Sequence, residues 1–260
     1  MKLQNILTMN VHVCSLTDAV QQVVNLSTQN TSSYVCVANV HMCMEAYDSR
    51  DFREIVNQAD LIVADGKPLS VAQKLLGHST ASQVRGQDLL NALCKVSAKQ
   101  GLKIGFYGGK STSLLQKVTH KLSKAYPGLQ VHYVYSPPFR PLTPQENVAV
   151  VAQLNASNID ILFVGIGCPK QETWMAEHKS QLNCVMLGVG AALDFVAGNK
   201  KYAPLWMQRM SLEWLFRFTS EPLRLWKRYL RQNPRFLYHC SKQLVNSTLT
   251  GKNNTRKRPC

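Results

Sequence analysis

Acidic residues are scarce in this chain and unevenly placed. The 260 residues include 30 Lys and Arg but only 15 Asp and Glu, which gives a formal net charge of +15. Residues 199–260 hold 14 of the basic residues and only 2 of the acidic ones, so the body before them is nearly balanced. A cationic segment of this kind predicts an anionic partner at one end of the molecule.

Long apolar runs and paired cysteines are also absent. No stretch reaches the roughly 18 apolar residues of a membrane-spanning helix, and MKLQNILTMN (1–10) lacks the apolar core of a secretory signal. The eight cysteines are scattered without a C-x-x-C pair, which argues against a zinc ribbon or a disulfide framework. We therefore expect a cytoplasmic protein with reduced thiols that is soluble or lies on a membrane surface.

Common nucleotide and metal motifs are missing as well. The chain has no G-x-G-x-x-G fingerprint, no G-x-x-x-x-G-K-[ST] loop and no Asp-x-Asp pattern. Any bound diphosphate is therefore expected to be neutralised by protein cations rather than by a metal. His41 and Cys43 lie close in sequence, but no further ligand has suitable spacing. We predict neither a metal site nor a cofactor.

Short apolar runs alternate with longer amphipathic stretches. The predicted strands are 34–39, 61–65, 102–108, 129–135, 160–167 and 184–190, and the predicted helices are 41–58, 68–77, 86–100, 111–125, 144–157 and 170–181. Near-continuous apolar strands are typical of a parallel sheet covered by helices on both faces. The sequence predicts a Rossmann-like, doubly wound α/β domain over residues 1–198, followed by a basic helical appendage over residues 199–260.

Polar or glycine-rich residues follow each predicted strand. These positions are Asn39, Asp65, 108–109, 136–138, 167–171, and Gly190 with Asp194. Ligands of open α/β sheets bind beyond the carboxyl ends of the strands, so we expect these positions to line one crevice. A carboxylate at a buried strand end, such as Asp65, is costly unless it is paired or used, and partial desolvation suits it to act as a general base. The alternative is a cap for the helix that begins near Pro68.

The turn GIGCPKQE (165–172) has two readings. Gly167 permits close backbone approach, the helix start offers N–H groups to an anion, and Gln171 can donate and accept hydrogen bonds at the same rim. It would then hold a phosphate or sugar hydroxyls; otherwise it is a tight turn with a proline near a helix start. Asp194, in GVGAALDFVAG (188–198), contacts a ligand or pairs with a basic residue of the tail.

A helix over residues 223–231 would be strongly amphipathic. One face would carry Leu223, Leu225, Trp226, Tyr229 and Leu230, and the other Arg224, Lys227, Arg228 and Arg231. Such a helix suits an anionic membrane surface. Alternatively, its apolar face packs on the body or on a second subunit. The sequence therefore does not determine whether the protein forms an oligomer. The body carries no nucleic-acid-binding motif, and no nucleic acid partner is expected.

Blocks of sequence resemble the bacterial WecG/TagA/CpsF glycosyltransferases from about residue 5 to about residue 238. In order they are VAN (37–39), ADGKPL (64–69), VRGQDL (84–89), FYGGK (106–110), YSPPFRPLT (135–143), VGIGCPKQE (164–172), GVGAALDFVAG (188–198) and RMSLEWLFRFTSEPLRLWKRYL (209–230). The resemblance implies inverting transfer from a UDP-sugar (N-acetylmannosamine, its uronic acid or glucose) to a sugar on undecaprenyl diphosphate. It also implies cell-surface polysaccharide synthesis and peripheral attachment to the inner membrane surface.

The resemblance also assigns roles to residues. Asp65 is similar to the family's proposed catalytic base, Asn39 and Gln171 fall on pocket positions, and Arg217, Arg224 and Lys227 fall on tail positions that close over the site and contact the diphosphate. Val37 and Lys227 stand where relatives often carry Thr and Arg. A uronic acid donor would be favoured by an extra basic residue in the pocket, and Arg85 is the one obvious candidate. Two other classes remain: an oxidoreductase on the same sheet, and a non-enzymatic membrane or nucleic-acid-binding module.

Overall fold

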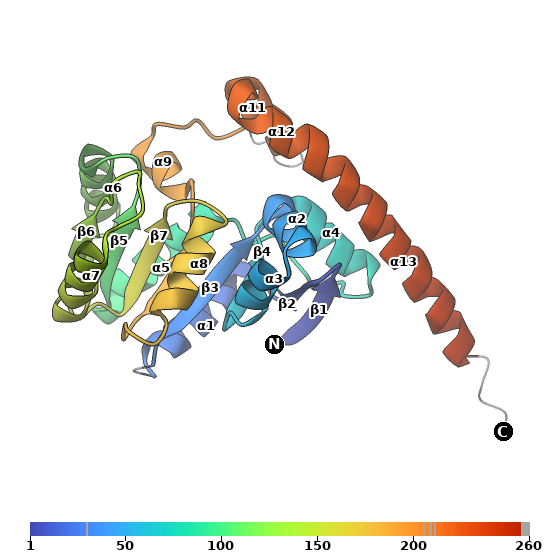
Figure 1. Ribbon diagram of the computed structural model, residues 1–260, viewed down its shortest axis with the longest axis horizontal. Coiled ribbons are helices and arrows are strands. Elements are labelled where there is room, and N and C mark those ends of the chain that lie inside the picture. The colour runs from blue at the N-terminus through green and yellow to red at the C-terminus, as the bar shows by residue number, and fades with distance from the viewer. Residues whose placement is uncertain (30, 205, 208–209, 211, 256–260) are drawn as a thin grey trace.

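A six-stranded parallel sheet lies at the centre of the molecule (Figure 1). The computed structural model describes residues 1–255 apart from residues 30, 205, 208–209 and 211. The strand order is β4-β3-β8-β7-β5-β6, with β3 (Ser33–Ala38), β4 (Leu61–Ala64), β5 (Lys103–Gly108), β6 (Gln130–Tyr135), β7 (Ile161–Gly165) and β8 (Val185–Gly188). All six predicted strands and the α/β class are confirmed.

Helices cover both faces of this sheet. One face packs against α1 (Leu16–Ser27), α5 (Gly86–Gln100), α6 (Thr112–Ala125) and α9 (Ala192–Ala197), and the other against α2 (Val40–Asp48), α3 (Arg50–Asn57), α4 (Lys67–Leu75), α7 (Pro144–Ala156) and α8 (Lys170–His178). Strand residues alternate between the two cores, so Phe163 enters one and Val164 the other. Burial on both faces explains why these strands read as continuous apolar runs.

The predicted single helix over 41–58 is wrong, because Ser49 divides it into α2 and α3. Ser49 has extended backbone angles, φ −117° and ψ 122°, and its hydroxyl accepts a hydrogen bond from the N–H of Phe52. Serine competes with helical hydrogen bonding in this way and therefore favours a cap. The division turns α3 across the end of α2, and it buries Phe52 and Val56 against the core.

The first 27 residues also form structure that the periodicity analysis did not assign. Strands β1 (Lys2–Ile6) and β2 (Met9–Val13) make an antiparallel hairpin, whose inward side chains are buried. Helix α1 begins at a capping box, in which Ser15 and Asp18 bond each other's backbone N–H groups. The S-x-x-D spacing before an apolar run was the available signal for this helix.

The last helix of the tail packs against the body. The tail comprises α11 (Glu213–Ser220), α12 (Pro222–Lys227), a π-helical turn (Arg228–Gln232) and α13 (Asn233–Thr255). Phe236 and Cys240 of α13 are buried in the same core as α2. Arg235 binds both carboxylate oxygens of Asp48 at 2.9 and 2.6 Å. Gln243 accepts from the N–H of Leu7 at 2.9 Å, which ties α13 to the hairpin.

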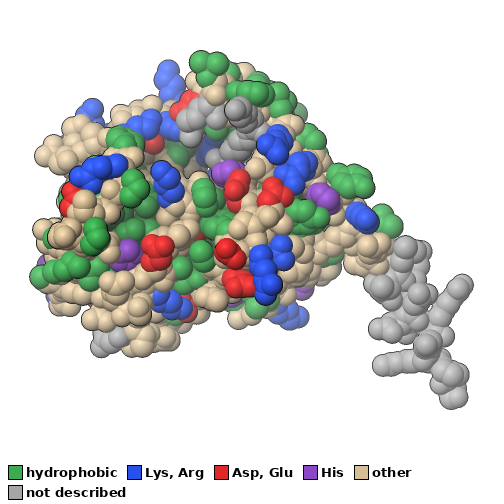
Figure 2. All heavy atoms as spheres, viewed as in Figure 1, with side chains coloured by type: hydrophobic (Ala, Val, Ile, Leu, Met, Phe, Trp, Pro, Cys, Tyr) green, Lys and Arg blue, Asp and Glu red, His purple; other side chains and the backbone are tan. Residues whose placement is uncertain are grey.

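The apolar face predicted for residues 223–231 is split between body and solvent. Leu225 is 3% exposed, whereas Leu223 and Leu230 are 91% and 65% exposed. A uniform α-helical wheel is wrong beyond residue 227, because the π-helical turn follows. Hydrophobic side chains stand out along the edge formed by α11, α12 and α13 (Figure 2). Within the described residues, no helix combines the length and apolarity needed to cross a bilayer.

The docking of α13 is testable with two neighbouring substitutions. Phe236 is 2% exposed and Leu237 is 63% exposed. Phe236→Ala should lower the free energy of unfolding of the unit that holds α13 by about 3 kcal/mol, because it leaves a cavity between α13 and α2. Leu237→Ala should change it by less than about 0.5 kcal/mol. Urea denaturation followed by hydrogen exchange measures both, and equal effects would show that α13 does not dock as described.

Candidate functional site

The carboxyl ends of all six parallel strands lie at one edge of the sheet. Asp65 follows β4, Asn39 follows β3, Asp194 lies beyond β8, and Gly167 follows β7. Neighbouring strands are about 4.8 Å apart, so the edge from β4 to β7 spans roughly 14 Å. The helices α2, α4, α6, α8 and α9 begin at this edge. Their positive ends favour an anionic ligand there.

Asp65 is held at the β4 end by backbone groups. Its Oδ1 accepts from the N–H of Gly86 at 3.0 Å, and its own N–H donates to the carbonyl oxygen of Ala38 at 2.8 Å. Gly86 begins α5, and a helix start is a setting that favours a negatively charged side chain. The carboxylate therefore joins the end of β4 to the start of α5. Asp65 also lies one residue before Gly66, the N-cap of α4, so it stands next to the start of the helix near Pro68.

Asn39 and Arg85 are the chain neighbours of Ala38 and Gly86, the two residues that bond Asp65. The side-chain oxygen of Asn39 caps α2 by accepting from the N–H groups of His41 and Met42 at 3.0 and 3.3 Å. Arg85 precedes Gly86, and its guanidinium lies 3.2 Å from a carboxylate oxygen of Glu213 on α11. The buried Nε of Arg85 has no hydrogen-bond partner within the described residues. This ion pair brings the tail next to Asp65.

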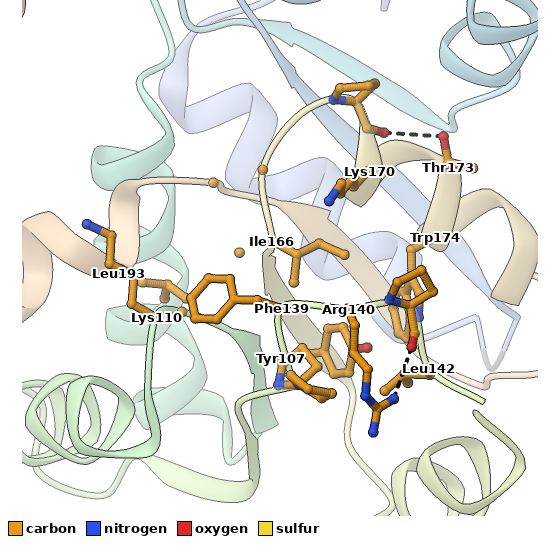
Figure 3. Close-up of a pocket in the computed structure, with 18 of the residues that line it drawn as sticks. Tyr107, Lys110, Phe139, Arg140, Leu142, Ile166, Lys170, Thr173, Trp174 and Leu193 are labelled. Carbon is orange, nitrogen blue, oxygen red and sulfur yellow. Dashed lines mark hydrogen bonds between the residues drawn. The ribbon is translucent and has the colours of Figure 1, made fainter. Parts of the chain in front are cut away.

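A cleft of about 850 Å³ occupies the other half of the edge. Its walls come from the ends of β5, β7 and β8, the start of α8, and the loop 137–144. Figure 3 shows Tyr107 and Trp174 at one end with Arg140, whereas Phe139 points toward the end where Lys110 lies. Tyr107 stacks on Trp174 with ring centroids 4.3 Å apart, and both side chains are buried. The stacked pair therefore supports this end of the cleft from beneath.

Cations gather in this cleft. Lys110, Arg140, Lys170 and Lys200 all line it. Glu146 neutralises Arg140 through two contacts of 2.7 Å, and Glu221 pairs with Lys200 at 2.9 Å. Among the described residues, Lys110 and Lys170 form no ion pair. The cleft can therefore bind an anion through two lysines and the helix ends. Asp194 lines the same cleft, so the structure brings it together with Gly167.

Gln171 lies beneath the cleft rather than at its rim. It is 3% exposed, and its Oε1 accepts from the N–H of Gly167 at 3.2 Å. Its Nε2 donates to Oε1 of Glu172 at 2.7 Å. Glu172 is fully buried, and burial raises the pKa of its carboxyl to about 7. Sequence reasoning missed Glu172, because an acidic residue in the first turn of a helix is ordinarily an exposed one.

A second, smaller cleft of about 280 Å³ lies between α9 and the tail. Asn199, Lys201, Arg217 and Tyr229 are among its lining residues. The guanidinium of Arg217 lies over the ring of Phe195, 5.0 Å from its centroid. The structure thus places Arg217 between tail and body. The side chains of Arg224 and Lys227, which were predicted to act with it, lie outside the part of the chain that the structure describes.

Comparison with known proteins identifies the family to which this chain belongs. The model of the WecG/TagA/CpsF family of glycosyl transferases matches residues 4–249. The chain belongs to this family. The match includes the body and most of the tail, so this glycosyltransferase shares both parts with its family. The assignment also replaces the oxidoreductase alternative.

Two characterised relatives are similar to it over most of their length. A protein of Staphylococcus aureus (strain MW2) is 30% identical over 236 residues, covering 87% of this chain and 88% of the relative. A protein of Bacillus subtilis (strain 168) is 28% identical over 229 residues, covering 88% and 86%. Both relatives are N-acetylglucosaminyldiphosphoundecaprenol N-acetyl-beta-D-mannosaminyltransferases.

The buried carboxyl of Glu172 predicts a pH dependence of stability. Burial raises its pKa from the ordinary value of 4.5 to about 7, so the folded state holds this proton more tightly than the unfolded chain. The stabilisation is full below the unfolded pKa and is lost as pH rises through about 7. Glu172→Gln, which cannot ionise, should therefore lose less stability than the wild type between about pH 5 and pH 8.

The measurement is the urea midpoint at a series of pH values. Glu54→Gln is the matched control, because Glu54 is an exposed residue of α3 that pairs with Arg50. The control should follow the wild-type curve. Parallel curves for all three proteins would contradict the raised pKa of Glu172.

Proposed function

We propose that this glycosyltransferase moves N-acetylmannosamine from UDP-N-acetylmannosamine to the N-acetylglucosamine of a diphosphoundecaprenol-linked acceptor, with inversion at the anomeric carbon. The observation that carries the proposal is the position of Asp65 on the same sheet edge as a cationic cleft large enough for a nucleotide sugar. The names of the relatives support the choice of sugar and acceptor. The reaction belongs to the synthesis of cell-surface polysaccharide.

The donor is assigned to the larger cleft. Its diphosphate would lie near the start of α8, where Lys170 and the helix end offer positive charge, with Lys110 on the opposite wall. Asp194 and the loop 137–144 would surround the nucleoside. This placement directs the sugar along the edge toward β8 and β3. The anomeric carbon then comes within reach of an acceptor held near Asp65.

Asp65 would act as the general base. Its carboxylate takes the proton from the acceptor hydroxyl as that oxygen attacks the anomeric carbon, and the bond from this carbon to the UDP oxygen breaks. The leaving diphosphate gains negative charge, which Lys110, Lys170 and the start of α8 stabilise. A single displacement of this kind inverts the anomeric centre.

The acceptor is assigned to the smaller cleft between tail and body. Arg217 and Lys201 line it and carry the charge needed to hold a lipid diphosphate. Glu213 of α11 pairs with Arg85, and the next residue, Gly86, bonds Asp65. The position of the tail is therefore linked to the position of Asp65. Residues 199–260 would thus act as an appendage that attaches to the anionic inner membrane surface and completes the acceptor site.

The donor assignment is tested by offering a panel of UDP-sugars with a lipid-diphosphate N-acetylglucosamine acceptor in EDTA, and measuring released UDP. Release that requires the acceptor and is fastest with UDP-N-acetylmannosamine is the expected result. Preference for UDP-glucose or for a uronic acid donor would replace the proposed sugar. No release with any donor from folded protein would overturn the proposed reaction.

The role of Asp65 predicts a selective loss of turnover. Asp65→Asn keeps an oxygen that can accept from the N–H of Gly86 but removes the base, so kcat should fall by at least about 100-fold. UDP binding, measured by calorimetry, should stay within about twofold, because the leaving group is held elsewhere. Asp51→Asn, an exposed change on α3, is the control. Unimpaired turnover by Asp65→Asn would exclude Asp65 as the base.

Membrane attachment is tested at the exposed apolar edge of the tail. Leu223 and Leu230 are 91% and 65% exposed, and burying one leucine in an apolar phase contributes about 1.5–3 kcal/mol. Replacing both with serine should weaken sedimentation with anionic vesicles by at least about tenfold. Val148→Ser, on the exposed side of α7, should have no effect. Equal sedimentation of the two variants would argue against attachment through this edge.

A further inference from the structure

The turn between β7 and α8 is held from below by two side chains. Gly167, at its centre, has φ +89°, which favours glycine, and a side chain there would meet open space. Gln171 bonds both backbone groups of Gly167. The backbone N–H of Gln171 donates to the carbonyl oxygen of Gly167 at 2.9 Å, and the side-chain Oε1 of Gln171 accepts from the backbone N–H of Gly167 at 3.2 Å. The open side of the turn faces the larger cleft, which Gly167 lines.

Glu172 fixes which way the amide of Gln171 points. Nε2 of Gln171 donates to Oε1 of Glu172 at 2.7 Å, so Oε1 of Gln171 is the atom that faces Gly167. In the flipped orientation, an NH2 group would face the N–H of Gly167, and both are donors. Glu172 is fully buried, and besides Gln171 its carboxyl interacts with the side chain of Cys168. A buried carboxyl is costly, and such cost is typical of functional sites.

We propose that Glu172 is a positioning residue for the nucleotide-sugar donor, which acts by orienting Gln171 so that the turn 165–170 keeps its shape against the donor diphosphate. Glu172 itself touches no substrate, since it lies under the turn. The inference rests on the proposed function, because it takes the larger cleft as the donor site. It gives the buried carboxyl a role in donor affinity rather than in the chemical step.

Three substitutions separate the hydrogen bond from the charge. Glu172→Leu removes the acceptor and should raise the KM for the UDP-sugar about tenfold, the effect of one lost buried hydrogen bond, while kcat changes by less than about twofold. Glu172→Gln keeps an acceptor oxygen at the same reach and should restore the wild-type KM. Glu172→Asp keeps the charge but is one methylene shorter, so its KM should resemble that of Glu172→Leu. Glu54→Gln should match the wild type.

A double-mutant cycle tests whether Glu172 acts through Gln171. Gln171→Leu should raise the donor KM by itself, and adding Glu172→Leu to it should cause no further rise, because the pathway is already broken. Additive effects on KM would overturn the proposal. The proposal would also fail if Glu172→Asp bound the donor as tightly as the wild type. Because Glu172→Asp retains a carboxylate, it serves as the test if Glu172→Leu does not fold.

Hydrogen exchange provides a readout that needs no substrate. The amide of Gly167 should exchange faster in Glu172→Leu than in Glu172→Gln, because its acceptor is oriented only in the second. Wild-type protein that releases no UDP, with this exchange difference present, would refute the proposed reaction and leave the support of the turn intact. Active wild type with equal donor KM and equal exchange in all variants would refute the positioning role alone.

Discussion

Parallel pairing between β3 and β8 joins the two halves of the site. Strand β3 is followed by Asn39 and lies beside β4, which is followed by Asp65, whereas β8 lies beside β7 and the cleft. The pairing runs from Ser33 with Val185 to Cys36 with Gly188. A shift of one residue would exchange the side chains that face the two cores, so burial on both faces fixes this register. The distance between the carboxylate and the cleft follows from it.

Close approach at Gly188 lets the turn between β7 and α8 rest on this junction. A Cβ atom there would lie 2.8 Å from Nε2 of Gln171 and 2.9 Å from Cε of Met175. Glycine therefore makes room for the side chain that bonds Gly167 and Glu172. The side chains of Gln171 and Met175, which lie under the turn, thus pack directly on Gly188 of β8. Gln171 and Glu172 thus connect the turn at Gly167 with the core beneath the sheet edge.

The tail has an anchored end and an exposed edge. Helix α13 is held on α2 and the hairpin by buried Phe236 and by the bonds of Arg235 and Gln243. Nearer the site, Leu223 and Leu230 face solvent while Leu225 packs inward. Among the described side chains of residues 223–231, packing on the body is therefore realised by Leu225 alone, and the apolar face is divided between body and solvent. An anchored tail keeps Arg217 close to the body, while its apolar edge faces solvent.

The six strands, their approximate ends and the polar residues that follow them can be predicted from the amino-acid sequence, because buried parallel strands are continuous apolar runs and turn chemistry is local. The sequence also carried the family resemblance in ordered blocks. The split of helix 41–58 at Ser49 was missed, because a serine cap competes only weakly with apolar periodicity. The strand order follows only from the folded structure, because it depends on pairing between segments that are distant in the chain. The folded structure alone showed that Glu172 is buried, since burial depends on what α8 packs against and not on the neighbours of Glu172 in the chain.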